Sequence, residues 1–229
     1  MDYEALKTAM LVDSKDQMKD SPNVRFEHLS NEGLRVLFVG NSVTLHAPSE
    51  SIGWFGDWGM AASGKEKDYV HLVEDHIKAK YPDASFCICN AADWERGYKN
   101  PEETFHAFEA ARRFDADIII LKLCANSPKD HFDAALFQSG LEKLITFLNK
   151  TGKAKVIVAT EFLKHPAEDS LIYVAKKFGY ALCYLSDIAD FEEYKAIGLF
   201  EHKGVAGHPG DKGMREIADR IIKTLDQII

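Results

Sequence analysis

Three polar residues in this chain have the types and settings that acyl-transfer chemistry needs. Ser42 follows an apolar run that ends at Gly40, and Asn126 follows another such run. His208 stands directly before Pro209 near the end of the chain. A serine hydroxyl becomes a useful nucleophile when a histidine takes its proton, and an oxyanion needs preorganised hydrogen-bond donors. The chain therefore carries a candidate nucleophile, base and oxyanion donor, if the fold brings them together.

The hydrophobic pattern predicts the elements that must position these residues. Short apolar runs rich in β-branched residues predict strands at 36–40, 84–90, 117–123, 154–160 and 180–185. Helical periodicity predicts helices at 65–81, from Pro101 onward, and at 132–149, 169–178 and 211–228, with Asp211 as the cap of the last. Strands that alternate with helices indicate a five-stranded parallel sheet covered on both faces.

Right-handed crossovers would place every strand-to-helix loop on one edge of this sheet, where such folds bind ligands. That edge collects a serine, a histidine, asparagines and carboxylates from segments 41–42, 90–97, 124–127, 160–161 and 204–211. Segment 45–64 is a long loop, and loops of this length are more often functional than idle. Its Trp54 and Trp58 offer faces that stack on sugar rings, or they anchor the loop to the core.

Composition sets bounds on the class of protein. The chain has 229 residues, 46% hydrophobic and 28% charged, which suits one domain, 1–229, with an N-terminal arm at 1–33. Within the arm, Ala5–Val12 is expected to form a short helix. The net charge of −8 argues against nucleic acid and anionic membrane surfaces as partners.

The start of the chain lacks the pattern of a signal peptide, and no apolar run is long enough to span a membrane. We therefore expect a cytoplasmic protein. The four cysteines, Cys87, Cys89, Cys124 and Cys183, lie in or beside apolar runs and are expected to be buried thiols, with no metal site.

From about Arg35 to its end, the chain resembles the SGNH or GDSL-like hydrolases, a superfamily of esterases and lipases. Gly40-Asn41-Ser42 matches the first block, usually Gly-Asp-Ser, and Cys124-Ala125-Asn126-Ser127 matches the third, usually Gly-x-Asn-Asp. Val205 to Pro209 matches the last block, usually Asp-x-x-His-Pro. Three segments, Gly40 to Thr44, the loop with Trp54 and Trp58, and His208 to Met214, are similar to those of a bacterial sub-branch of esterase-like members of this superfamily. The resemblance implies a three-layer, flavodoxin-like α/β/α fold.

The resemblance assigns roles to residues of this chain. Ser42 takes the nucleophile position, His208 the base position, and Asn126 the position of the side-chain oxyanion donor. The second block, whose glycine gives an oxyanion amide, falls near Glu95, and Gly97 is the nearest glycine.

The sequence departs from the family at the acid position, where Val205 replaces the aspartate. A Ser-His pair is therefore expected, with His208 oriented by a backbone carbonyl near Gly204. The alternative is a carboxylate from elsewhere, Glu201, Glu161 or above all Glu95.

The sequence therefore predicts a serine esterase acting on a small acyl ester, with O-acetyl on a carbohydrate as the suggested substrate and no cofactor. Candidate substrate-binding residues are Asn41, Trp54, Trp58, Asn90 and Glu161, although solvation of the surface is the default role for Glu95 and Glu161. Two other hypotheses stay open. One is a flavodoxin-like module that holds FMN phosphate after the first strand, and the other is an inactive relative that only binds glycans.

Overall fold

The structure, a computed structural model, describes residues 21–229, so the helix expected at Ala5–Val12 lies outside the described residues. Its centre is a six-stranded sheet in the order β1-β3-β2-β4-β5-β6. The strands are β1 (Val24–Glu27), β2 (Arg35–Gly40), β3 (Ser85–Asn90), β4 (Ile118–Lys122), β5 (Lys155–Ala159) and β6 (Ala181–Cys183). Every neighbouring pair is parallel except β1 with β3. The expected α/β fold with a largely parallel sheet is confirmed.

The strand count differs from the expectation of five, because β1 lies in the segment predicted to be a surface arm. β1 runs antiparallel to β3, with Val24 opposite Cys89. Val24 is buried and Phe26 packs against the core, while Arg25 forms an ion pair with Asp57. A strand of four residues is too short for such alternation to stand out in a sequence.

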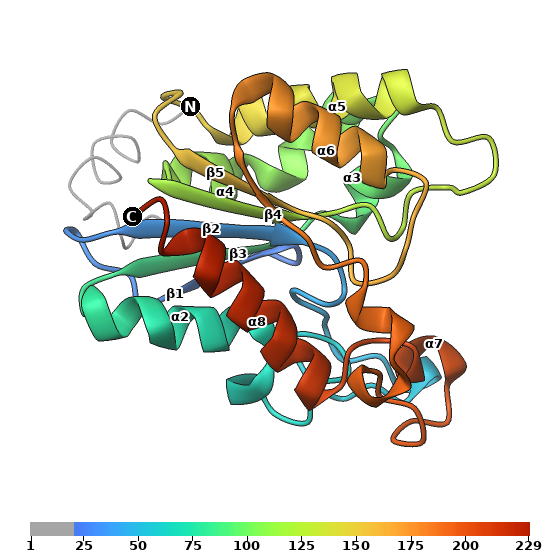
Figure 1. Ribbon diagram of the computed structural model, residues 1–229. Helices are drawn as coiled ribbons and strands as arrows, with labels where there is room; N and C mark the ends of the chain where they lie inside the picture. Colours follow the sequence, from blue (N-terminus) through green and yellow to red (C-terminus); the bar gives the residue numbers. More distant parts are fainter. Residues whose placement is uncertain (1–20) are drawn as a thin grey trace, which may run out of the picture.

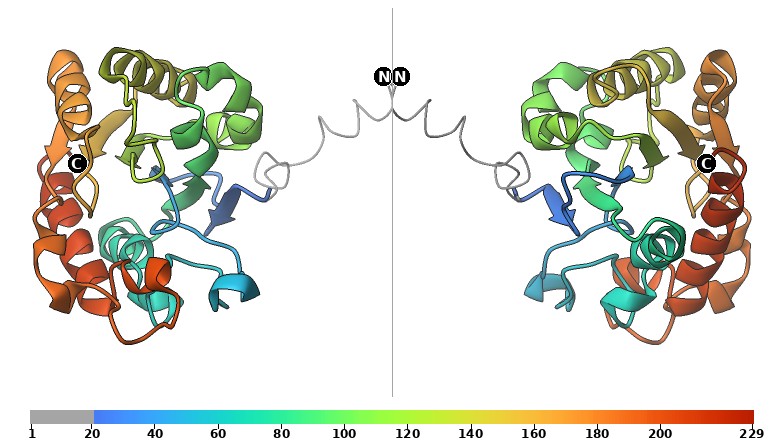
Figure 2. Two further views of the ribbon diagram at one scale, coloured as in Figure 1. Left: turned by 90° about the vertical axis from the view of Figure 1, so that its right-hand side faces the viewer. Right: turned by 90° about the vertical axis from the view of Figure 1, so that its left-hand side faces the viewer.

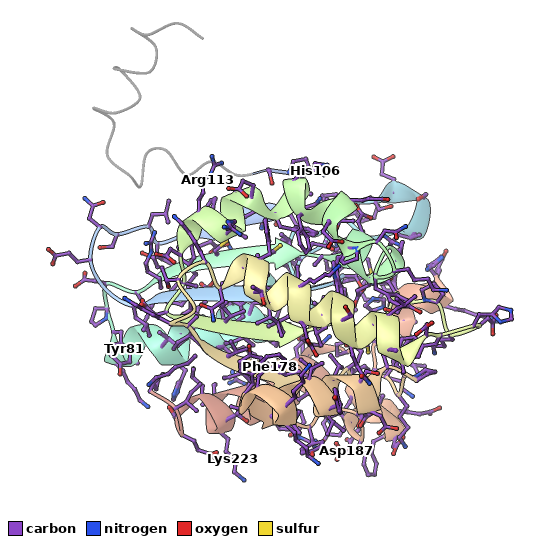
Figure 3. The ribbon with its side chains drawn as sticks, turned by 90° about the horizontal axis from the view of Figure 1, so that it is seen from above. Tyr81, His106, Arg113, Phe178, Asp187 and Lys223 are labelled. Carbon is purple, nitrogen blue, oxygen red and sulfur yellow. The ribbon has the colours of Figure 1, made fainter. Side chains whose placement is uncertain are left out.

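Helices cover both faces of the sheet (Figure 1). One face carries α3 (Ala92–Arg96), α4 (Glu109–Phe114), α5 (Ala134–Leu148) and α6 (Glu168–Phe178), and the other carries α2 (Tyr69–Lys80) and α8 (Asp211–Leu225). Seen from above, α5 and α6 lie side by side across the sheet (Figure 3). Residues of β2 alternate between the two faces: Leu37 and Val39 join one core cluster, and Val36 and Phe38 join the other.

Several helices begin differently from the prediction. Segment Lys65–Lys67 is a separate 3-10 turn, because Asp68 caps α2 by accepting a hydrogen bond from the His71 amide at 2.9 Å. Pro101–Phe108 is likewise a 3-10 helix ahead of α4. Gly210, not Asp211, holds the N-cap of α8. The Asp211 carboxylate instead accepts hydrogen bonds from Ser63.

The sheet changes direction of winding at β2, since β3 lies on one side of it and β4 on the other. The loops that follow β2 and β4 therefore flank a crevice, the usual ligand site of open parallel sheets. The left view of Figure 2 looks toward this edge, where the loop after β2 meets the segment that carries α7 (Lys203–Ala206). Trp54, Met60 and Val205 join the two in a small apolar cluster.

Within residues 21–229, no helix combines the length and the apolar character needed to cross a bilayer.

Candidate active site

Ser42 stands in a tight turn just past the end of β2. The amides of Thr44 and Leu45 both donate to the Asn41 carbonyl, at 2.9 and 3.1 Å. The turn needs a glycine before it, because a Cβ on Gly40 would lie 1.8 Å from Thr44 Oγ1. The turn thus holds Ser42 at the carboxyl edge of the sheet, in the wall of the cavities described below.

His208 faces the Ser42 hydroxyl. Its Nε2 lies 2.8 Å from Ser42 Oγ, and its Nδ1 lies 2.7 Å from the Gly204 carbonyl oxygen. A carbonyl can only accept, so Nδ1 carries the ring proton and Nε2 is free to accept the serine proton. Burial lowers the pKa of His208 below its ordinary value, which favours the neutral ring. The contact with a backbone carbonyl near Gly204, expected in place of an acid, is present.

Val205, which stands at the family's acid position, belongs to the apolar core. Its side chain is 1% exposed and packs in the cluster with Trp54 and Met60. The amide of His208 donates to the Val205 carbonyl at 2.9 Å, which fixes the backbone next to the ring. The backbone of α7 therefore orients His208, while the Val205 side chain joins the loops.

Asn126 lies beside Ser42 and is held by a buried carboxylate. Glu95, which is 0% exposed, accepts hydrogen bonds from both the backbone amide and the side-chain amide of Asn126. It also accepts from the Cys124 amide at 2.5 Å and from Asn41 Nδ2 at 3.0 Å. One side chain on α3 thus ties together the turns after β2 and β4.

The amides expected from the second block do not serve as oxyanion donors. The Glu95 amide donates to the Ala91 carbonyl at 3.1 Å, and the Gly97 amide donates to the Asp93 carbonyl at 2.9 Å. Both are used inside the short helix α3, which the sequence prediction treated as an irregular loop. The prediction for Glu95 and Gly97 as oxyanion residues is therefore wrong. The part of Glu95 that matters is its carboxylate, which holds Asn126.

A second buried carboxylate extends this network. Glu161 is 2% exposed and forms an ion pair with Lys122, which is 0% exposed and lies at the end of β4. Asn41 Nδ2 donates to Glu161 at 2.8 Å as well as to Glu95, and so bridges the two carboxylates. Burial, and then the charge of Glu161, raise the pKa of Glu95. Surface solvation, the default role for both glutamates, is therefore excluded.

Cys124 occupies the position of the family's glycine in an unusual backbone conformation. Its φ is 138°, although its side chain is buried. A residue with a Cβ in this region of φ costs about 1–3 kcal/mol and persists only where its surroundings hold it. The hydrogen bond from its amide to Glu95 is such a restraint.

Two cavities meet at Ser42, Asn126 and His208. The larger, about 370 Å³, has a mixed wall in which the polar side chains are Asn23, His46, Asn90, Asp93, Arg96 and His202, and the apolar ones include Ile52, Met60 and Val205. The smaller, about 170 Å³, has a mostly apolar wall that includes Val43, Ala125, Phe162, Leu163 and Pro209. Ser42, Asn126 and His208 thus stand between a larger cavity of mixed polarity and a smaller, mostly apolar one.

The tryptophans anchor the loop after β2. Trp54 is 3% exposed, donates to the His46 carbonyl at 3.2 Å and meets Trp58 edge to face. Trp58 donates to the Ala62 carbonyl at 3.0 Å. Neither lines the cavities just described, so their prediction as a sugar platform is wrong and the anchoring alternative holds.

The other predicted binding residues border different cavities. Asn90 borders the larger cavity, and Glu161 and Asn41 border the smaller one. Asn41 is nevertheless 0% exposed and its side chain is fully used within the protein. Lys122 belongs to the network around Glu161 without being predicted from the sequence, where its only signal is a lysine at the end of the apolar run of β4.

Comparisons with known proteins address the fold. No protein-family model and no curated protein sequence matches the chain. Among solved structures, a two-domain esterase active on acetylated mannans, co-crystallised with mannopentaose, aligns with a TM-score of 0.56 and 17% identity. The alignment covers 85% of this chain and 50% of that one, so this chain spans about half the length of that esterase.

Two further structures align over nearly their whole length. The esterase EstA from Pseudoalteromonas sp., inhibited by monoethylphosphonate, has a TM-score of 0.54 and 15% identity, covering 84% of this chain and 97% of that one. A GDSL-like lipase candidate from Parabacteroides merdae ATCC 43184 has a TM-score of 0.57 and 12% identity, covering 84% and 95%. The chain thus has the fold of the SGNH/GDSL-like hydrolases, as the sequence resemblance implied.

Proposed function

We propose that this protein is a serine ester hydrolase with Ser42 as nucleophile and His208 as general base. The observation that carries the proposal is the chain of contacts from Ser42 Oγ to His208 Nε2, 2.8 Å, and from His208 Nδ1 to the Gly204 carbonyl, 2.7 Å. Nucleophile, base and orienting group then stand in the order that activates a serine. The likeness of the fold to solved esterases supports the same assignment.

Each catalytic step has a residue of this chain to perform it. Ser42 attacks the ester carbonyl while His208 takes its proton, and His208 then protonates the departing alcohol. In the second half of the reaction, His208 takes a proton from the water that attacks the acyl-enzyme. It then returns a proton to Ser42 as the carboxylic acid leaves. This chemistry needs no metal or organic cofactor.

Asn126 is assigned to the oxyanion together with the Ser42 amide. A side-chain amide has two N–H bonds, and Glu95 accepts one of those of Asn126. The other is assigned to the oxyanion, because Asn126 borders both cavities beside Ser42. An amide fixed in advance needs no reorganisation when charge develops, which is the condition for stabilising the transition state.

The two cavities suggest the substrate class. The small apolar cavity suits a short acyl chain, and the larger cavity, whose mixed wall carries several hydrogen-bonding side chains, suits an alcohol with several hydroxyl groups. An O-acetylated carbohydrate meets both conditions. The similarity to an esterase active on acetylated mannans is consistent with this class.

Labelling and turnover together test the proposal. A fluorophosphonate probe is expected to modify Ser42 in the wild type and to leave Ser42→Ala unmodified. From a panel of p-nitrophenyl esters and acetylated sugars, the wild type is expected to hydrolyse at least one ester that Ser42→Ala does not. The matched control is Ser139→Ala, at an exposed position of α5, which is expected to keep both labelling and turnover. Labelling at another residue, or equal turnover by Ser42→Ala, would contradict the assignment.

The alternative hypotheses have less support. FMN binding after β2 would need the Thr44 hydroxyl, which is buried and lies 2.6 Å from the Tyr69 hydroxyl. A purified flavoprotein would be yellow, which is a direct check. An inactive glycan-binding relative would bind acetylated sugars without turning any of them over.

A further inference from the structure

A cluster of ionisable residues lies between the edge strand β1 and helix α2, apart from the candidate active site. Glu27 ends β1, His28 follows it, and Glu74 lies in the middle of α2. One carboxylate oxygen from each glutamate and one ring nitrogen of His28 all lie within 4.8 Å of one another. Two segments far apart in the sequence thus bring three ligand atoms to one point.

Glu74 is the unexplained member of this cluster. Its side chain is 1% exposed, and neither of its oxygens has a hydrogen-bond partner among the described residues. A buried carboxylate without a partner costs several kcal/mol, and a protonated carboxyl would still leave a buried donor unpaired. A cation held between Glu74, Glu27 and His28 would satisfy these oxygens.

We propose that Glu27, His28 and Glu74 form a site for a zinc ion. Two carboxylate oxygens and an imidazole nitrogen are ligands that zinc accepts, and a histidine ligand favours zinc over magnesium. The cation neutralises Glu27 and Glu74 together and supplies the partner that the Glu74 oxygens lack. The site joins β1 to α2, so its role is structural.

His71 borders the cluster beside Glu27 but is not one of the three residues whose ligand atoms all lie within 4.8 Å of one another. Its Nε2 lies 3.5 Å from Glu27 Oε1, while its Nδ1 lies 2.7 Å from Asp68 Oδ1. Both ring nitrogens of His71 thus face carboxylates, which holds the ring next to Glu27. Asp68 is itself held by the amide of Gly59 at 2.9 Å.

Two lysines compete with the cation. Lys65 Nζ lies 2.8 Å from Glu27 Oε1, and Lys78 Nζ lies 3.4 Å from His28 Nε2. Both have long side chains, and that of Lys65 is 44% exposed, so both heads can move into water when a metal enters. Zinc therefore replaces one ion pair, which is weak where its lysine is exposed, and one hydrogen bond between a lysine and a histidine.

Zinc binding by the metal-free full-length chain tests the site. Equilibrium dialysis is expected to give one zinc ion per chain, bound far more tightly than magnesium, and zinc is expected to raise the Tm. Glu74→Gln, which keeps the shape of the side chain, and His28→Ala, at the exposed end of the cluster, are each expected to weaken binding by about tenfold or more.

Matched controls lie on the opposite face of the sheet. Glu103→Gln and His106→Ala change exposed residues of the same types in the 3-10 helix before α4, where Figure 3 labels His106. These controls are expected to leave zinc affinity unchanged. Failure of the wild type to bind zinc, or binding that neither Glu74→Gln nor His28→Ala weakens, would overturn the proposal. The measurement does not depend on esterase activity.

Discussion

Asn126 donates two hydrogen bonds to one oxygen of Glu95, one from its backbone amide and one from its side chain. This double contact fixes both the turn after β4 and the orientation of the amide group. Glu95 is completely buried, so water cannot take its place. Helix α3 therefore contributes no oxyanion amide, but its Glu95 side chain fixes the orientation of Asn126, the residue proposed to bind the oxyanion.

A double-mutant cycle tests whether Glu95 acts through Asn126. Asn126→Ala is expected to lower kcat about 100- to 1000-fold with little change in KM, because the charge it meets exists only in the transition state. Glu95→Gln is expected to lower kcat in the wild type but to have little further effect in Asn126→Ala. Exposed Glu103→Gln is the control. An equal loss from Glu95→Gln in both backgrounds would show that it acts independently of Asn126.

The dependence of activity on pH follows from the setting of His208. Burial lowers its pKa below the ordinary value of 6.5, and the base must be neutral to accept a proton. We expect kcat/KM to stay level through neutral pH and to fall only as the pH drops through the lowered pKa. The measurement is a pH profile with a small ester. An acid limb above pH 6.5 would indicate a carboxylate that stabilises the imidazolium and would contradict the dyad.

Restoring the family's acid by Val205→Asp is expected to damage the protein rather than create a triad. The side chain is 1% exposed and packs with Trp54 and Met60 at the wall of the larger cavity, so an aspartate there would be buried among apolar side chains. We expect the free energy of unfolding to fall by about 3 kcal/mol or more, measured by urea denaturation. Normal stability together with a raised kcat would instead mean that this position can reach the His208 ring.

The small apolar cavity is expected to set the length of the acyl chain. Ala125 lines it, so Ala125→Leu would reduce its volume of about 170 Å³. We expect kcat/KM to fall more for p-nitrophenyl butyrate than for the acetate, and Ala135→Leu, at an exposed position of α5, to change neither. An equal fall for both esters would assign the acyl group to the larger cavity.

The parts of the fold that sequence could predict are those whose signal is local. Apolar runs such as that of β4 identify buried parallel strands, and the block pattern identifies Ser42, Asn126 and His208, which the fold brings to one edge. The direction of a side chain carries no such local signal. Glu95 has the sequence setting of a solvated residue, and only the packing of α3 against the turns after β2 and β4 shows that its carboxylate points inward.

Trp54 and Trp58 illustrate the same limit. Their place in a long loop beside the nucleophile fits a ligand platform and a loop anchor equally well, because the sequence does not say which face of the loop meets the core. The contacts of Trp54 with the cluster around Val205 decide the matter. Similarly, the sequence shows Val205 at the acid position and favours a carbonyl near Gly204 over a distant carboxylate as the group that orients His208, but only the folded chain decides between the two.

The antiparallel strand β1 has a consequence for how far this protein can be shortened. It covers the hydrogen-bonding edge of β3, which would otherwise be an open template for another chain. β1 is itself only four residues long, and its Arg25 and Glu27 are charged, which are features that discourage edge-to-edge pairing. A fragment that begins after Glu27 would expose the long apolar edge of β3 and should aggregate, even with every proposed catalytic residue in place.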